Sequence, residues 1–188
     1  GRNNFHSSLY LAHGVTTVLE PYVAFDSGYS QAELVNAGRI LGPRTYSTGA
    51  GIHSITPDPS VQNQAQANEQ VEARLSRGAI SVKNFLESLR SQRKMINMAA
   101  LKQGASVTNE GADLNFNISL ILDGGTGFEH ALNYLRAYRD VEQFFGKSRA
   151  VYSPTLVVGG NGFWAEEKYK AESPLWEQEK LQRFVPWR

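Results

Sequence analysis

Residues 79–85 read AISVKNF, a short β-rich run that carries a lysine, Lys83, near its end. A helical pattern follows over residues 89–102 and is closed by Gly104, and residues 105–110 (ASVTNE) then form a second β-rich run. A strand, a helix and another strand in this order are typical of a βα unit in a parallel sheet. A lysine is out of character in a strand that otherwise looks buried, so this stretch is also a candidate for function.

The same alternation extends in both directions along the chain. The expected strands are residues 14–20, 44–48, 79–85, 105–110, 128–130 and 150–158, and helical patterns cover 30–41, 67–77 and 89–102 and outline two more helices after residues 114 and 135. Leu34, Ala37 and Leu41 form the expected apolar face of the first of these helices, and the strand at 14–20 is β-branched enough to be covered on both faces. We therefore predict an α/β fold of about six βα units, with parallel strands in sequential order and helices outside.

The length of the chain sets a limit on this architecture. A complete (β/α)8 barrel usually needs about 250 residues, whereas the chain has 188. We therefore expect residues 1–188 to form a single, incomplete barrel domain. Hydrophobic residues make up 41% of the chain and charged residues 20%, as in ordinary globular proteins. The 19 Lys and Arg nearly balance the 18 Asp and Glu without a dense basic stretch, and no apolar run is long enough to cross a membrane. A small-molecule substrate is expected, with neither nucleic acid nor membrane as a partner.

Three polar residues occupy equivalent places on successive predicted strands. Lys83, Glu110 and His130 each lie at or near the C-terminal end of a strand. In a parallel barrel these ends share one mouth, so the three side chains are expected to converge there around one or two ions. The chain has no cysteine, which leaves nitrogen and oxygen ligands, and these suit Zn, Mn or Ni.

Two further residues are candidates for binding substrate at this mouth. His53 lies in a long polar loop, residues 49–65, and Tyr152 lies on the last predicted strand. Loops at residues 50–59 and 159–164 are expected to choose the substrate. A solvated loop histidine and a core tyrosine with a satisfied hydroxyl are the plain alternatives for these two residues.

Six segments of the chain, in order, resemble the amidohydrolase superfamily, in particular its imidazolonepropionase-like and prolidase-like branch. They are LAHGVTT (11–17), AGRILGPR (37–44), SVK (81–83), VTNEG (107–111), FEH (128–130) and YSPTL (152–156). Each segment alone is weak, whereas the ordered set is fairly specific and covers nearly the whole chain.

The resemblance implies a TIM-type barrel whose strand-four lysine is carboxylated and bridges two divalent metals, zinc being the expected ion. Lys83 fits that lysine, and His130 fits a histidine ligand on strand six. A neutral lysine reacts with CO2 to give an anion with two oxygens that can bridge cations. Glu110 stands where the family more often has histidine, and it resembles the carboxylate variant with a Val-Thr-x-Glu-Gly sequence.

The family's His-x-His pair on strand one and its catalytic aspartate on strand eight have no counterpart in the chain. We therefore expect an internal segment that starts just before strand two and stops after strand seven. The resemblance implies a parent enzyme that hydrolyses carbon-nitrogen bonds, such as amides and cyclic amides, with metal-activated water. The alternatives are a prolidase-like dipeptidase and, in another class, a non-catalytic barrel segment that serves for binding or assembly.

Simpler interpretations exist for each candidate ligand. Lys83 could be a strand-end lysine paired with a carboxylate, and Glu110 could cap a helix that begins near Gly111. Glu129 is expected to point to the opposite strand face from His130 and not to share its role.

Several expectations concern the segment as it stands. With only Lys83, Glu110 and His130 available, it should hold no complete binuclear centre and should show no substantial hydrolase activity. Two open barrel edges should favour self-association. Some relatives carry an N-terminal β-propeller and are exported, so both a periplasmic and a cytoplasmic location are compatible with the sequence.

Overall fold

Strands and helices alternate along the chain in the computed structural model, which describes residues 5–23, 25–53, 61–87, 89–130, 137–155, 172 and 174–185. The strands are β1 (Thr17–Glu20), β2 (Arg44–Ser47), β3 (Ser81–Asn84), β4 (Ser106–Glu110), β5 (Gly127–Glu129) and β6 (Val151–Ser153). The helices are α1 (Phe5–Ala12), α2 (Phe25–Asn36), α3 (Gln64–Leu75), α4 (Arg90–Lys102), α5 (Leu114–Leu122), α6 (Arg139–Ser148), the 3-10 turn η1 (Leu175–Glu177) and α8 (Glu179–Phe184).

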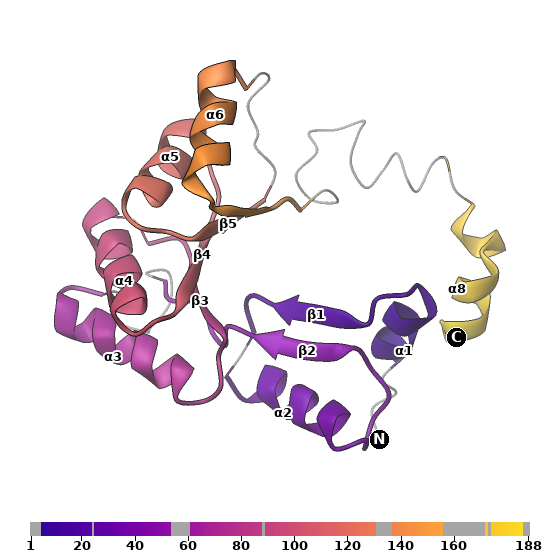
Figure 1. Ribbon diagram of the computed structural model, residues 1–188. Coiled ribbons are helices and arrows are strands. Elements are labelled where there is room, and N and C mark those ends of the chain that lie inside the picture. The colour runs from indigo at the N-terminus through magenta and orange to yellow at the C-terminus, as the bar shows by residue number, and fades with distance from the viewer. Residues whose placement is uncertain are drawn as a thin grey trace.

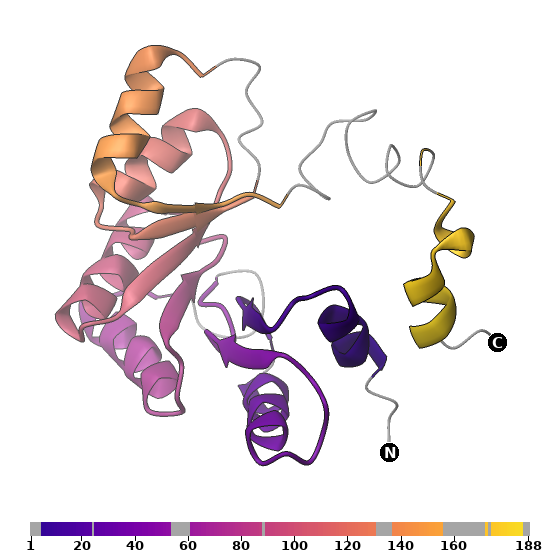
Figure 2. The ribbon, with the colours of Figure 1, turned by 45° about the vertical axis from the view of Figure 1, so that its right-hand side comes forward.

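The strands form two parallel sheets in sequential order, β1-β2 and β3-β4-β5-β6. The two sheets meet after β2, where Ile52 makes an isolated parallel bridge to Asn84 and the Ile80 amide donates to the Ser47 carbonyl over 3.3 Å. Figure 2 shows β1 and β2 set at an angle to the larger sheet. The predicted parallel, sequential arrangement is confirmed, and the described residues contain no closed barrel.

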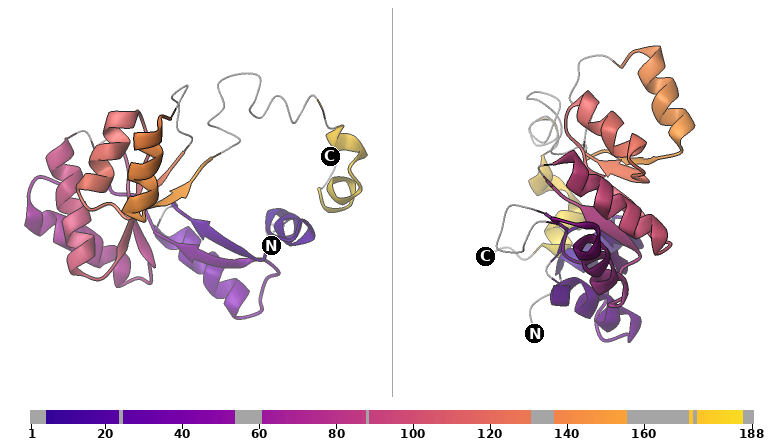
Figure 3. Two further views of the ribbon diagram at one scale, coloured as in Figure 1. Left: turned by 45° about the horizontal axis from the view of Figure 1, so that its top comes forward. Right: turned by 90° about the vertical axis from the view of Figure 1, so that its left-hand side faces the viewer.

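Helices α3, α4, α5 and α6 lie together on one face of the larger sheet (Figures 1 and 3). The core lies between that face and the helices. It contains apolar residues of α3, α4, β3 and β4 with exposures of 1% or less: Ala67, Val71, Val82, Ile96, Ala99, Ala100 and Val107. Among the described helices, none is long and apolar enough to cross a membrane. The opposite face of the sheet is left for polar side chains.

Helix boundaries follow local chemistry. The Asn63 side chain accepts from the Gln66 amide at the start of α3, and Asp113 Oδ1 accepts from the Phe116 amide over 2.9 Å at the start of α5. Gly38, with a φ of 67°, lies just after α2. These are the positions at which side-chain oxygens or a left-handed backbone satisfy the free groups of a helix end.

Three local predictions were wrong. The helix predicted at 30–41 begins at Phe25 and ends at Asn36, and its expected apolar face is exposed, with Leu41 70% accessible. The cause is the left-handed turn at Gly38, which ends the helical periodicity before Leu41. β1 is not covered on both faces: Leu19 is 46% exposed, because its side of the strand opens onto a pocket and not onto packed side chains.

The last predicted strand is also shorter than expected. β6 ends at Ser153, and Pro154 follows it directly, as predicted for a proline at the mouth. Residues 156–158 of that strand, the loop at 159–164 and most of the loop at 50–59 lie outside the described residues.

Candidate functional site

Strand register brings the side chains of Lys83, Glu110 and Glu129 to the helix-free face of the larger sheet. Lys83 pairs with Thr108, Glu110 with Glu129, and Glu129 with Ser153, so all lie on one face. Alternate residues point the other way, toward the helices, where Val82, Val107 and Phe128 are buried. The site is therefore a direct consequence of period-two alternation in neighbouring parallel strands.

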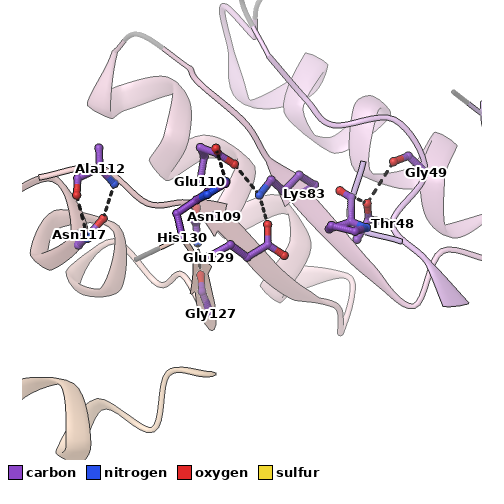
Figure 4. A network of polar contacts seen from close by, with 11 residues as sticks. Thr48, Gly49, Lys83, Asn109, Glu110, Ala112, Asn117, Gly127, Glu129 and His130 are labelled. Atoms are coloured by element: carbon purple, nitrogen blue, oxygen red, sulfur yellow. Dashed lines mark hydrogen bonds and ion pairs between the residues drawn. The ribbon is translucent and has the colours of Figure 1, made fainter. Parts of the chain in front are cut away.

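Lys83 is the centre of this cluster and is only 2% exposed. Its Nζ lies 2.8 Å from Glu110 Oε2 and also contacts Glu129 Oε2, and Figure 4 shows the nitrogen between the two carboxylates. A buried ammonium is stable only when it is paired, and two carboxylates provide the pairing. The simple interpretation of Lys83 as a strand-end lysine paired with a carboxylate thus describes its contacts in this structure.

His130 reaches the cluster by a different route. It follows the last residue of β5 and has a φ of 71°, so the chain has already left the alternation of the strand. Its Nε2 lies 2.7 Å from Glu110 Oε1, and Glu110 is therefore shared between His130 and Lys83. The expected convergence of Lys83, Glu110 and His130 is confirmed, and their role as metal ligands stays a prediction.

Glu129 is the site residue that the sequence analysis missed. It was expected to point away from the site because its neighbour His130 points into it, and that expectation was wrong. Both side chains reach the cluster because Glu129 ends β5 on the inner face and the left-handed turn at His130 brings the next side chain to the same side. The available signal was the register: Glu129 aligns with Glu110 when β4 and β5 pair at their C-terminal ends.

Glu110 does not cap a helix. Asp113 occupies the N-cap of α5, and the Glu110 carboxylate is held by Lys83 and His130. Gly111 then allows the end of β4 to approach β5 closely: its amide donates to the Glu129 carbonyl over 3.1 Å, and a Cβ there would come within 2.2 Å of that oxygen. A glycine is needed here so that the two carboxylates can stand side by side.

A pocket of about 620 Å³ opens over the cluster at the junction of the two sheets. It is lined by the charged or ionisable side chains of Lys83, Glu110, Glu129 and His130. Ser153 at the end of β6 and the following Pro154 and Thr155 also line it. The rest of the lining is Leu19 of β1, Pro21 and Tyr22 after β1, and Phe85 after β3. The pocket therefore has a charged part and an apolar part.

Neither predicted substrate-binding residue belongs to this lining. His53 is buried at 7% exposure behind the pocket, with its ring edge-on to Phe85 at a centroid distance of 6.2 Å, so it is not a solvated loop histidine. Tyr152 stacks on Phe128 at 4.8 Å, on the helix side of the sheet, because it pairs with Phe128 in the β5-β6 register. Their roles in substrate binding stay predictions.

The donor set can be compared with what a divalent metal needs. Within the described residues, no three histidine or acidic side chains converge as metal ligands do. Glu110 and His130 supply an oxygen and a nitrogen donor, Glu129 adds a second carboxylate beside Lys83, and carboxylation of Lys83 would add further oxygen donors. The residues fit a divalent cation in donor type and in charge, since two carboxylates already surround a buried positive group.

No protein-family model and no curated protein sequence matches the chain. Solved structures do match it. A Xaa-Pro dipeptidase with bound methionine is 18% identical, with a TM-score of 0.69 over 88% of this chain and 47% of that chain. The ochratoxinase of A. niger is 18% identical, with a TM-score of 0.66 over 94% of this chain and 48% of that chain. Phenylurea hydrolase B is 14% identical, with a TM-score of 0.65 over 78% of this chain and 43% of that chain.

The chain shares their fold. Other matched structures include an amidohydrolase and a prolidase, so the resemblance predicted from the six segments is confirmed at the level of fold. The chain spans about half the length of these structures. At such low identities the likeness concerns the fold, and the chemistry has to be argued from the site.

Proposed function

We propose that the protein to which this chain belongs is a metal-dependent hydrolase of carbon-nitrogen bonds, acting on amides or cyclic amides. The observation that supports this most directly is the buried Lys83, held at the strand mouth between two carboxylates and, through Glu110, next to His130. Strand C-terminal ends are where parallel barrels place catalytic groups. The fold shared with a dipeptidase and other hydrolases agrees with the proposal.

Carboxylated Lys83, Glu110 and His130 would hold the metal. When bound, it supplies Lewis acidity and makes water a nucleophile near neutral pH. The chain's own contribution is positional: Glu110 orients the His130 ring through the 2.7 Å contact, and Glu129 is within reach of the Lys83 nitrogen. Ser153 and Thr155 add hydroxyl groups to the lining that can orient the substrate's polar atoms.

The test compares Lys83→Met with Lys102→Met, an exposed lysine at the end of α4, in the full-length protein. Hydrolysis of N-acyl amino acids, cyclic amides and Xaa-Pro dipeptides is measured with added zinc or manganese, and again after chelation. We expect Lys83→Met to lose about 100-fold or more of kcat/KM and Lys102→Met to lose none. Chelation should remove the activity and fresh metal should restore it.

The substrate panel also separates the alternatives. Turnover confined to Xaa-Pro dipeptides would indicate a prolidase-like dipeptidase. Turnover that survives Lys83→Met or chelation would contradict the metal mechanism. Complete inactivity of the full-length protein with every metal would favour a non-catalytic barrel segment that serves for binding or assembly.

A further inference from the structure

The apolar part of the pocket is an exposed aromatic surface next to the charged cluster. Tyr22, in the loop after β1, is 44% exposed, and its ring lies 4.9 Å from the Phe85 ring at an interplanar angle of 51°. Both residues line the pocket together with Leu19 and Pro21. Large apolar side chains left exposed in a concave, partly charged pocket are typical of a binding surface.

The Tyr22 ring is seated on the backbone of Gly51. A Cβ at Gly51 would come within 2.6 Å of two ring carbons of Tyr22 and within 3.1 Å of the Phe85 Cβ. A glycine is therefore required for the ring to lie where it does. The loop that carries Tyr22 is fixed as well, because Thr48 Oγ1 donates to the Pro21 carbonyl over 2.7 Å.

Arg74 in turn fixes the backbone beneath Tyr22. This arginine of α3 is only 2% exposed, and its Nε donates to the Ala50 carbonyl and its Nη2 to the Gly51 carbonyl, at 2.5 and 3.3 Å. Its Nη1 donates to the Gln70 carbonyl over 2.7 Å, which holds the guanidinium against its own helix. Because the buried Arg74 guanidinium binds both loop carbonyls, the backbone beneath the Tyr22 ring is held in place before any ligand binds.

Backbone hydrogen bonds set the position of this aromatic surface relative to Lys83. The Ile52 amide donates to the Lys83 carbonyl and the Phe85 amide to the Ile52 carbonyl, both at 2.8 Å. The Phe85 ring centroid lies 5.8 Å from Lys83 Nζ. Tyr22 and Phe85 are therefore within reach of a group next to any polar atom bound over the cluster.

We propose that Tyr22 and Phe85 form a specificity subsite for a planar aromatic side group next to the substrate's carbon-nitrogen bond, with Arg74 as a positioning residue. The proposal rests on the proposed function. Two tilted rings offer π faces and edges to a third ring at centroid distances of about 4.5 to 7 Å, where aromatic groups attract beyond simple burial. A small aliphatic group would leave part of this surface uncovered.

The experiment uses the full-length protein and two pairs of amides that differ only in a phenyl ring. These are N-acetyl-L-phenylalanine with N-acetyl-L-alanine, and phenylacetylglycine with acetylglycine. We expect Tyr22→Ala to lower kcat/KM about tenfold for a phenyl substrate, mainly through KM, and to lower it much less for its methyl partner. Tyr22→Phe should keep the preference. An equal loss for both members of each pair, or no loss, would overturn the subsite.

Arg74 is tested through the same preference. Arg74→Met should reduce the phenyl-over-methyl ratio, and the matched control Arg77→Met, an exposed arginine just after the same helix, should leave it unchanged. Since Arg74→Met could fail to fold, Gly51→Ala provides an independent disturbance of the ring's seat and should lower the ratio too. An unchanged ratio in folded Gly51→Ala would contradict the support proposed for Tyr22.

Binding without turnover separates this proposal from the proposed function. Calorimetry on metal-depleted protein should show N-acetyl-L-phenylalanine binding about tenfold more tightly than N-acetyl-L-alanine, and Tyr22→Ala should abolish the difference. If no amide is hydrolysed but this difference is present, the subsite stands and the hydrolase proposal fails. Equal binding of the two compounds would refute the subsite whatever the activity.

Discussion

The two sheets of the protein differ in how deeply their strands are buried. All four residues of β3 are buried, whereas β1 alternates between exposed and half-buried positions. β3 pairs with β4 on one edge, meets Ile52 on the other and is packed by α3 and α4. The well-covered sheet therefore holds the paired charges of the pocket in fixed positions, whereas the thinly covered sheet supplies most of its apolar surface, with Phe85 after β3 as the remaining part.

The largest expected effect tests that difference in packing. Phe128 is 1% exposed in β5, between the rings of Tyr152 and Phe145. Phe128→Ala should lower the free energy of unfolding by about 3 to 5 kcal/mol, through lost burial and the cavity left behind. Leu19→Ala in β1, where the side chain is already 46% exposed, should cost less than about 1 kcal/mol. Urea denaturation measures both, and equal losses would remove the contrast between the sheets.

The next effect concerns the paired charges. Lys83→Met leaves Glu110 and Glu129, which are 16% and 12% exposed, close together without their shared counter-ion. We expect a loss of about 3 kcal/mol in the free energy of unfolding. Adding Glu129→Gln to Lys83→Met should recover part of that loss, because one of the two uncompensated charges is removed. A double variant that is less stable than Lys83→Met would show that the ion pairs are not coupled as the structure indicates.

A smaller, pH-dependent effect is expected at Glu87, a buried acid that follows the C-terminal end of β3. Glu87 is 1% exposed, and burial raises the pKa of its carboxyl, while the Val61 amide and Arg93 act in the opposite direction. The pKa of Glu87 is therefore higher in the folded state than in the unfolded state. The contribution of this group to the free energy of unfolding is fully present below the unfolded-state pKa and is lost as pH rises through the folded-state pKa.

Glu87→Gln should therefore reduce the fall in stability above about pH 4 and should stabilise the protein near neutral pH. The matched control is Glu72→Gln, at an exposed position of α3. Urea unfolding over a pH series measures the effect. A Glu87→Gln variant that is less stable than the wild type at neutral pH would mean that the charged carboxylate is stabilising in place.

The smallest effect is expected at an ion pair outside the pocket. Arg90 pairs with Asp123 at 2.6 Å but is 57% exposed, in contrast to Lys83. The hydrogen bond from Arg90 lowers the pKa of the Asp123 carboxyl in the folded state. The contribution of this carboxylate to the free energy of unfolding is therefore present above the unfolded-state pKa and is lost as pH falls through the folded-state pKa. Arg90→Ala should raise the pKa of Asp123 in an NMR titration and should lower stability less than Lys83→Met does, since solvent screens the charge of the exposed Arg90.

Much of the fold was predictable because its signals are local. The β-rich runs and helical patterns gave six parallel strands in the right order, and the glycine and proline stops placed most boundaries within a few residues. The helix predicted at 30–41 was the exception, since the left-handed turn at Gly38 ends the helix before the predicted apolar face reaches Leu41. The sequence did not show that β1 is less buried than β3, because the burial of a strand depends on which other elements pack against it.

Three of the residues that meet beyond β3, β4 and β5 could be predicted from the sequence alone: Lys83, Glu110 and His130 stand at strand ends, and parallel strands bring such ends together. That Glu129 joins them became visible in the folded chain, since the turn at His130 breaks the two-residue alternation on which the prediction relied. The fold likewise brings Tyr22, Phe85 and Gly51, which are distant in the sequence, into one surface beside Lys83. The alternation of side chains along a strand and the position of a strand end follow from neighbouring residues. A backbone turn and the packing of one loop on another depend instead on contacts between distant parts of the chain.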